Sequence, residues 1–136
     1  MKKISVGIII LNWNGFEDTQ LLLSSIQKLQ TTYDYTIYVI DNASTDGSKE
    51  KLSTNKSIRL IPLAENRGFT GANNQGIEQA IHDGVDYCWI LNNDTIVDPK
   101  ALDALIHPFE QEKVYGSGQR SARYEIIKEN ACQKYF

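Results

Sequence analysis

The chain has 136 residues, the size of one small domain, and 41% of them are hydrophobic, which is enough for a globular core. Its formal net charge of -3 argues against a nucleic-acid or anionic-membrane surface. Two cysteines are too few for a disulfide framework or a zinc site, and no apolar run approaches the ~20 residues that span a bilayer. We therefore expect a cytosolic globular protein.

Strands and helices are predicted to alternate along the first 110 residues. Strands are predicted at residues 4–11, 36–40, 58–63 and from Tyr87 to about Asp94. Helices are predicted at residues 16–29, 48–53, 72–82 and from Pro99 to about Phe109. The uninterrupted apolar run at 4–11 is typical of a strand covered on both faces. The pattern predicts an α/β fold with a doubly wound, mainly parallel sheet.

The chain is predicted to divide near residue 110. Residues 1–110 are expected to form one ligand-binding α/β domain, because the strand and helix signals end there. Residues 111–136 are more polar and form a C-terminal tail of uncertain structure, in which a helix is favoured around Arg123 to Asn130. The sequence assigns this tail no place in the sheet.

Polar clusters follow three of the predicted strands. They are Asn12-Trp13-Asn14, Asp41-Asn42 and Asn92-Asn93-Asp94. Right-handed crossovers place the carboxyl ends of parallel strands at one edge of a sheet, where open α/β sheets bind ligands. Asp94 and Thr95 offer the hard oxygen atoms that Mg²⁺ or Mn²⁺ takes together with phosphate. We hypothesise that Asp94 holds such a cation, and that the cation holds the diphosphate of a nucleotide-sugar.

Each of these residues also has an ordinary structural interpretation. Trp13 offers a flat face for a base, and core packing suits it equally. Asp41 would accept a hydrogen bond from a pyrimidine N–H or a ribose hydroxyl, or would stabilise a turn. Arg67 suits a phosphate contact or a solvated surface position. Asn93 and Asp94 also suit a plain turn.

Several other sites that bind nucleotides or activate nucleophiles are excluded. The turn after the first strand, at residues 12–15, lacks the Gly-x-Gly-x-x-Gly fingerprint, and the chain has no P-loop and no Gly-x-Ser-x-Gly elbow. That turn also lacks the glycine-rich basic loop that nucleotidyltransferases use. His82 and His107 lie in predicted helices far from the strand ends, so neither is a convincing general base.

Four blocks of the chain, taken together, resemble a known family. Residues 8–15, 39–48, 65–77 and 91–95 resemble the successive blocks of a family 2 glycosyltransferase, with the rhamnosyltransferase-like branch closest. Four blocks in the right order are far more specific than any one of them. The resemblance implies a GT-A nucleotide-diphosphosugar transferase-like fold. It also implies inverting transfer of a sugar from a dTDP- or UDP-sugar to a glycan or lipid-linked acceptor in cell-surface polysaccharide synthesis.

The resemblance also implies roles for individual residues. Asp41 matches the carboxylate that recognises the nucleotide base, and Trp13 matches an aromatic position beside that base. Asp94 matches the metal-binding member of an Asp-x-Asp element, in which Asn92 replaces the first acidic residue. Arg67 matches a loop near the phosphates. The full nucleotide-sugar-binding set is Asn12, Trp13, Asn14, Asp41, Arg67, Asn92 and Asn93, with Asp94 as the metal ligand.

The resemblance implies a catalytic half that this sequence does not supply. Full enzymes of the family continue past this length, and their second half provides the acceptor site and the base that deprotonates the acceptor hydroxyl. No residue of this chain is assigned as that base. The alternative is therefore a truncated, catalytically inactive nucleotide-sugar-binding module. Peripheral association with the inner face of the membrane and a homo-oligomer are left open.

Overall fold

The computed structural model describes residues 3–111 and 124–128. The strands are β1 (Ser5–Asn12), β2 (Asp34–Asp41), β3 (Arg59–Pro62), β4 (Tyr87–Asn92) and β5 (Tyr124–Lys128). The helices are α1 (Phe16–Ile26), α2 (Ser48–Ser53), α3 (Gly68–His82) and α4 (Ala101–Gln111). The strands form one sheet in the order β3-β2-β1-β4-β5. The pairs β3–β2, β2–β1 and β1–β4 are parallel, and β5 is antiparallel to β4.

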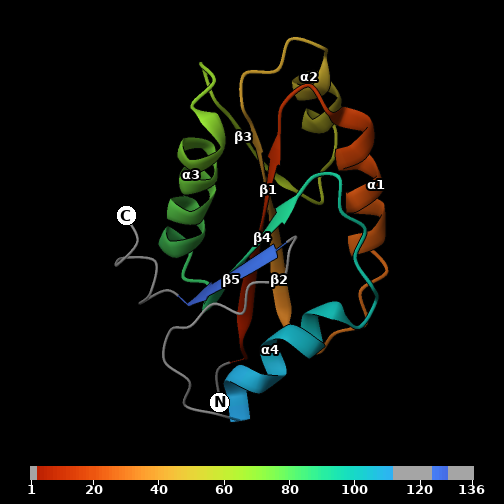
Figure 1. Ribbon diagram of the computed structural model, residues 1–136, viewed down its shortest axis with the longest axis vertical. Helices are drawn as coiled ribbons and strands as arrows, with labels where there is room; N and C mark the ends of the chain where they lie inside the picture. Colours follow the sequence, from red (N-terminus) through yellow and green to blue (C-terminus); the bar gives the residue numbers. More distant parts are fainter. Residues whose placement is uncertain (1–2, 112–123, 129–136) are drawn as a thin grey trace.

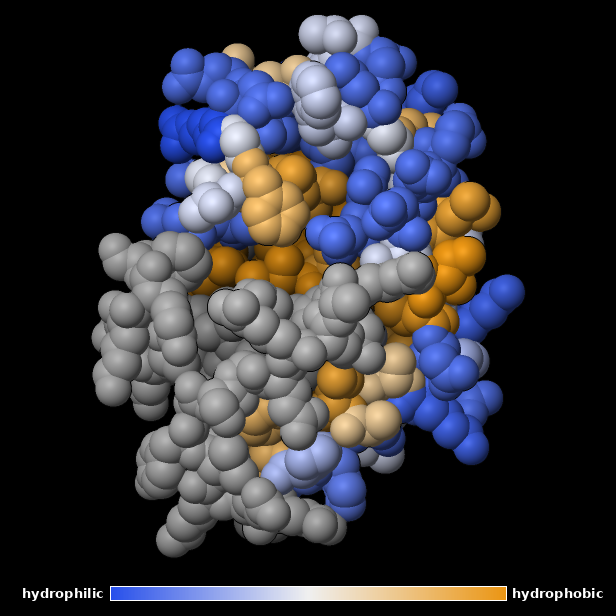
Figure 2. Space-filling model, viewed as in Figure 1, coloured by the Kyte–Doolittle hydropathy of each residue, from blue (hydrophilic) through white to orange (hydrophobic). Residues whose placement is uncertain are grey.

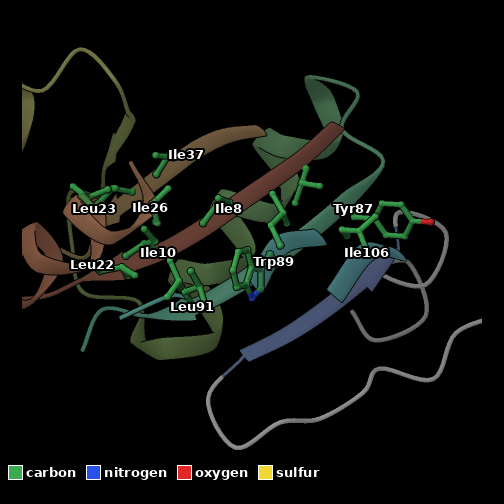
Figure 3. Close-up of a cluster of buried hydrophobic side chains, with 14 of the residues drawn as sticks. Ile8, Ile10, Leu22, Leu23, Ile26, Ile37, Tyr87, Trp89, Leu91 and Ile106 are labelled. Carbon is green, nitrogen blue, oxygen red and sulfur yellow. The ribbon is translucent and has the colours of Figure 1, made fainter. Parts of the chain in front are cut away.

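Helices cover both faces of the sheet (Figure 1). On one face α3 packs on Ile9 of β1 and Ile40 of β2. On the other face α1, α2 and α4 pack on Ile8, Ile10 and Trp89 in a larger apolar cluster (Figure 3). Because side chains alternate along a strand, β1 supplies buried residues to both clusters. The predicted doubly wound, mainly parallel α/β fold is confirmed.

The close approach of α3 to the sheet depends on Gly76. A Cβ atom at this position would lie 2.5 Å from Ile40 Cδ1 and 2.8 Å from Ile9 Cγ2. Real Cβ atoms essentially never approach neighbours so closely. A glycine inside a helix costs about 1 kcal/mol relative to alanine, so packing, and not helix propensity, accounts for this residue.

A hydrogen-bonded group joins β2 and β3 to the C-terminal end of α3. Tyr38 of β2 donates a hydrogen bond from its hydroxyl to Asp83 Oδ2 at 2.7 Å, and Arg59 of β3 forms an ion pair with the same carboxylate. Gln79 Nε2 also donates to Asp83 Oδ1 at 3.1 Å. The hydrogen bond from Tyr38 is the main reason why the pKa of Asp83 is lowered.

The end of β4 and the start of α3 differ from their predicted positions by a few residues. β4 ends at Asn92, because the Thr95 N–H donates to the Asn92 carbonyl at 3.2 Å and closes a turn. α3 begins at Gly68, four residues before its predicted start at Ala72. Hydrogen bonds between Asn42 and the loop before α3 fix that start.

The C-terminal tail was predicted incorrectly where the structure describes it. Residues 124–128 form the edge strand β5, whereas the sequence favoured a helix around 123–130. β4 would otherwise leave a row of backbone groups unpaired at the sheet edge, and pairing with β5 satisfies them. The remaining residues assigned to the tail lie outside the described ranges. Within residues 3–111 and 124–128, no helix has the length and apolarity that a membrane crossing requires.

Replacing Gly76 by alanine is expected to destabilise the domain. The added methyl group must displace Ile9, whose Cγ2 branches directly from the strand, and overpacking of this kind typically costs 1–3 kcal/mol. After the helix-propensity gain, we expect the free energy of unfolding to fall by about 1–2 kcal/mol. Urea unfolding measures this difference. Glu78→Ala, at an exposed position of the same helix, is the control and should change stability by less than about 0.5 kcal/mol.

Replacing Asp83 by asparagine is expected to change how stability depends on pH. Because folding lowers the pKa of Asp83, its contribution is complete above the ordinary carboxyl pKa of about 3.9 and is lost as the pH falls below that value. The wild-type chain should therefore exceed the variant in stability at pH 7, and the difference should shrink towards pH 3. Thermal unfolding at both pH values measures this. A difference that stays constant from pH 7 to pH 3 would contradict the assignment.

Candidate functional site

The three polar clusters meet at the carboxyl edge of the sheet, as the sequence predicted. In the parallel register Asn12 pairs with Asp41, and Leu11 pairs with Asn92. The Asn42 N–H donates to the Asn12 carbonyl at 2.8 Å, which continues the β1–β2 ladder past the end of β2. Three chain segments that lie far apart in the sequence therefore end side by side.

The strand pleat divides these polar residues between the two faces of the sheet. Asn12 has the same parity as Ile8 and Ile10 of β1, and Asp41 has the same parity as Val39 of β2. These two polar side chains therefore point to the α1 side. Asn42, one residue later, contacts the loop before α3 on the opposite side.

A chain of side-chain hydrogen bonds connects the strand ends on the α1 side. Asn12 Nδ2 donates to Asp41 Oδ1 at 3.0 Å. Thr19 of α1 donates from Oγ1 to Asn12 Oδ1 at 2.7 Å and accepts a bond from Asn93 Nδ2 at 3.3 Å. Asn12, Thr19 and Asp41 are all completely buried. This network links β2, β1, α1 and the segment after β4.

The loop after β2 folds over the same network. The Ser44 N–H donates to Asp41 Oδ2 at 3.0 Å, and Ser44 Oγ accepts bonds from Asn12 Nδ2 and from the Asn14 N–H. Asn14 Oδ1 in turn accepts a bond from the Thr45 N–H at 2.8 Å. Asn14 and Ala43 both adopt positive φ, at 48° and 61°, which is costly for residues other than glycine. The two loops therefore hold each other in a specific shape.

Burial makes Asp41 a structural residue whatever else it does. Both carboxylate oxygens accept hydrogen bonds, and the residue has no exposed surface. Loss of this carboxylate would remove one of the two acceptors of the Asn12 amide and the acceptor of the Ser44 N–H, so a substitution at Asp41 costs stability. Asp46 in the following loop accepts bonds from the Ser48 hydroxyl and N–H at the start of α2, and these bonds lower its pKa.

On the α3 side, Asn42 holds the loop that carries Arg67. Asn42 Oδ1 accepts a bond from the Arg67 N–H at 2.8 Å, and its Nδ2 donates to Asn66 Oδ1 at 3.1 Å. Asn66 Oδ1 also accepts a bond from the Gly68 N–H at 2.8 Å, where φ is +70°. These contacts fix the first turn of α3 and leave the Arg67 side chain exposed at its N-terminus.

The exposed residues at this edge are the ones available to a ligand. Trp13 is 55% exposed and Phe69 is 59% exposed, which is unusual for large apolar side chains, and Arg67, Asn92 and Asp94 are exposed as well. Figure 2 shows recessed apolar atoms bordered by mostly hydrophilic ones in the upper half of the face in view. An aromatic surface beside charged groups suits a ligand with a planar ring and phosphates.

The residues around Asp94 fit a cation that arrives together with a phosphate ligand. Among residues 3–111 and 124–128, no group of three or more His, Cys, Asp or Glu side chains forms a ready metal cage. Asp94 is exposed, and its carboxylate accepts no hydrogen bond from the described residues. Mg²⁺ typically takes one or two carboxylates from the protein and the rest of its ligands from phosphate and water. Asp94 therefore suits the role that the sequence predicted, with a diphosphate supplying further oxygens.

Three residues of this edge are absent from the predicted donor-binding set, although Asn42 belongs to a polar cluster that the sequence analysis named. Thr19 and Asn42 are buried and hydrogen-bonded to predicted site residues. Asn73 of α3 is 4% exposed, and neither of its side-chain polar atoms has a partner among the described residues. Thr19 lies on the buried face of an amphipathic helix, where a threonine gives no signal of its own. Only the block 65–77 as a whole pointed towards Asn73.

Replacing Asn12 by alanine is expected to destabilise the chain strongly. The buried Asp41 carboxylate would lose a donor and the Thr19 hydroxyl would lose its acceptor, and each unsatisfied buried group costs about 1–3 kcal/mol. We expect the free energy of unfolding to fall by about 2–4 kcal/mol in urea titrations. Asn55→Ala removes a half-buried amide whose oxygen accepts a hydrogen bond from the Ser57 N–H, and should cost less than about 1 kcal/mol. Similar losses for the two variants would refute the importance of burial at Asn12.

Solved structures share this fold. TarS residues 1–349 from S. aureus, in complex with UDP, superposes with a TM-score of 0.71 and 16% identity, over 88% of this chain and 39% of that one. The mannosyltransferase PcManGT from Pyrobaculum calidifontis, in complex with GDP-Man and Mn²⁺, gives a TM-score of 0.63 and 21% identity, over 78% and 32% of the two chains. The fold is that of the GT-A glycosyltransferases.

Sequence comparisons identify the family. The poly-beta-1,6-N-acetyl-D-glucosamine synthase of Staphylococcus aureus strain COL is 37% identical over 115 residues, which cover 82% of this chain and 27% of that protein. The same-named protein of Staphylococcus epidermidis is 28% identical over 115 residues. This chain spans about a quarter of the length of these relatives. The profile of the family described as Glycosyl transferase family 2 matches residues 7–130. The chain therefore belongs to glycosyl transferase family 2.

Proposed function

We propose that this chain supplies the donor-binding part of an inverting glycosyltransferase. The donor is a nucleotide-diphosphosugar, a dTDP- or UDP-sugar, and the acceptor is a glycan or a lipid-linked glycan in cell-surface polysaccharide synthesis. The relatives named for poly-N-acetylglucosamine synthesis and the neighbour solved with UDP support this class of reaction. The rhamnosyltransferase-like branch stays a prediction, as does an association with the inner face of the membrane.

The observation that carries the proposal is the meeting of three strand ends at one edge. Trp13 is exposed directly after the buried Asn12, Arg67 is exposed in the loop that Asn42 holds, and Asp94 is exposed beyond the end of β4. In this proposal Trp13 lies against the base and Arg67 faces the phosphates. Asp94 binds Mg²⁺ or Mn²⁺, which neutralises charge on the departing diphosphate when it is bound. Asn14 and Asn92 complete the polar rim around the donor.

The proposal gives Asn12, Asn93 and Asp41 an indirect part in donor binding. Asn12 and Asp41 are completely buried, and the Asn93 amide donates to Thr19 and to the Gly15 carbonyl. These side chains shape the edge against which the donor lies. For Asp41, direct recognition of the base would require the loop at 42–47 to move aside, since Ser44 covers one carboxylate oxygen.

The transfer step requires a base, and none of the described residues is assigned to that role. The acceptor hydroxyl oxygen forms a bond to the anomeric carbon while the bond from that carbon to the diphosphate oxygen breaks. The hydroxyl proton passes to the base, and the configuration at the anomeric carbon inverts. A catalytically inactive nucleotide-sugar-binding module is the second candidate function, because no described residue is assigned as that base.

One experiment separates the two candidates. The chain is incubated with a nucleotide-sugar, Mn²⁺ and candidate acceptors, and nucleotide release is followed together with nucleotide binding. Acceptor-dependent release supports the transferase. Metal-dependent binding without release supports the module, and no binding at all contradicts both.

Replacing Asp94 by alanine is expected to abolish the part of nucleotide binding that depends on the metal. Asp94 is the main charged ligand that the protein offers the cation, so Mn²⁺ should no longer strengthen the binding of UDP or dTDP. Isothermal titration calorimetry with and without Mn²⁺ measures this effect. The control is Asp98→Ala in the same loop, where Asp98 is exposed and its carboxylate accepts a hydrogen bond from the Lys100 N–H. Unchanged affinity of the Asp94 variant in Mn²⁺ would refute the metal site.

A further inference from the structure

We propose that helix α1 is the element that positions Asp94 for the metal, through two separate anchors on either side of this residue. The first anchor joins Asn93 to Gly15 and Thr19, and the second joins Val97 to Ser25. This inference rests on the proposed metal-binding role of Asp94. It assigns Thr19, Ser25 and Asn93 as positioning residues, which act through Asp94 and need not touch the donor.

Asp94 depends on its backbone for its orientation. Its exposed carboxylate accepts no hydrogen bond from the groups that the structure describes, so none of the described side chains fixes its direction. The residue lies in a turn that the Thr95 N–H closes on the Asn92 carbonyl at 3.2 Å. The position of that turn relative to the sheet edge therefore decides where the carboxylate lies.

The first anchor holds the residue immediately before Asp94. Asn93 Nδ2 donates to Thr19 Oγ1 at 3.3 Å and to the Gly15 carbonyl at 3.4 Å, which places its amide against the first turn of α1. A Cβ atom at Gly15 would lie 2.6 Å from Asn93 Nδ2, so only glycine leaves room for the amide. Block 8–15, one of the four that resemble the family, thus ends in Gly15. The amide of Asn93, in block 91–95, occupies the space that a side chain at position 15 would need.

The second anchor holds the chain three residues after Asp94. The Val97 N–H donates to Ser25 Oγ at 3.1 Å, and both residues are almost fully buried. Ser25 Oγ also donates to the Leu22 carbonyl within α1 at 2.7 Å, which fixes its rotamer with the acceptor lone pair towards Val97. Ser25 lies six residues after Thr19 along α1, and the segment from Asn93 to Val97 follows the same helix.

Two anchors on one rigid helix restrict the Asp94 turn far more than one would. Groups that hold a metal ligand in place are worth a large part of the metal affinity, and their loss typically weakens binding about tenfold or more. The second anchor has no contact with the Asn12–Asp41 network, so its removal should act on the metal site alone.

The test compares nucleotide affinity with and without Mn²⁺ for two substitutions of the full chain. Ser25→Ala removes the acceptor for the Val97 N–H, and Thr19→Val removes the hydroxyl that bonds Asn93. For each, we expect the strengthening of UDP binding by Mn²⁺ to fall roughly tenfold. For Ser25→Ala, affinity for UDP in EDTA should stay within about twofold of the wild-type value. A merely structural role would weaken binding equally in both conditions.

The matched control is Ser24→Ala. Ser24 is exposed on the same helix, and its hydroxyl donates to the Gln20 carbonyl, so the Mn²⁺ effect should be unchanged. Thr19→Ser keeps a hydroxyl and should retain the wild-type Mn²⁺ effect, which gives a readout even where Thr19→Val fails to fold. If Asp94→Ala removes the Mn²⁺ effect and both Ser25→Ala and Thr19→Val leave it intact, the positioning role is overturned. If Asp94→Ala itself leaves it intact, the proposed metal site fails instead.

Discussion

The buried amide of Asn12 is the contact on which the carboxyl edge of the sheet depends. It lies at the end of the central strand. It donates a hydrogen bond to the buried Asp41 carboxylate and accepts one from the Thr19 hydroxyl of α1. A carboxyl group inside a protein is tolerated only when it is hydrogen-bonded, and Asn12 and Ser44 supply donors to Asp41. Any rearrangement of β1, β2 or α1 would leave a buried polar group unsatisfied, so these elements keep one mutual geometry.

The pleat of the sheet separates the residues that build this edge from those that can meet a ligand. On the α1 side, Asn12 and Asp41 are buried and bonded to protein groups. Beyond the strand ends, Trp13, Arg67 and Asp94 are exposed. A ligand site needs both sets, because exposed side chains bind well only when the backbone beneath them is already fixed. α1 supplies that support below Asp94, and Asn42 supplies it below the Arg67 loop.

Much of this fold was predictable because its signals are local. Apolar runs and helical periodicity located four parallel strands and four helices, and the helix at 48–53 matched its prediction. The tail was the exception: residues 124–128 form a strand whose partner, β4, lies more than thirty residues earlier, and no local pattern contains that pairing. The start of α3 at Gly68 was missed for a similar reason, since Asn42 fixes it from another strand.

The sequence by itself determined the fold class, the convergence of three polar strand ends and the family, because strand order, alternation and short blocks are written along the chain. Only the tertiary structure decided which polar residues are buried and support the edge of the sheet, and which are exposed. Thr19 was invisible to sequence reasoning, since a threonine on a helix acquires meaning only when Asn12 and Asn93 lie within hydrogen-bonding distance of it. The need for glycine at position 15 likewise arises from a side chain 78 residues away.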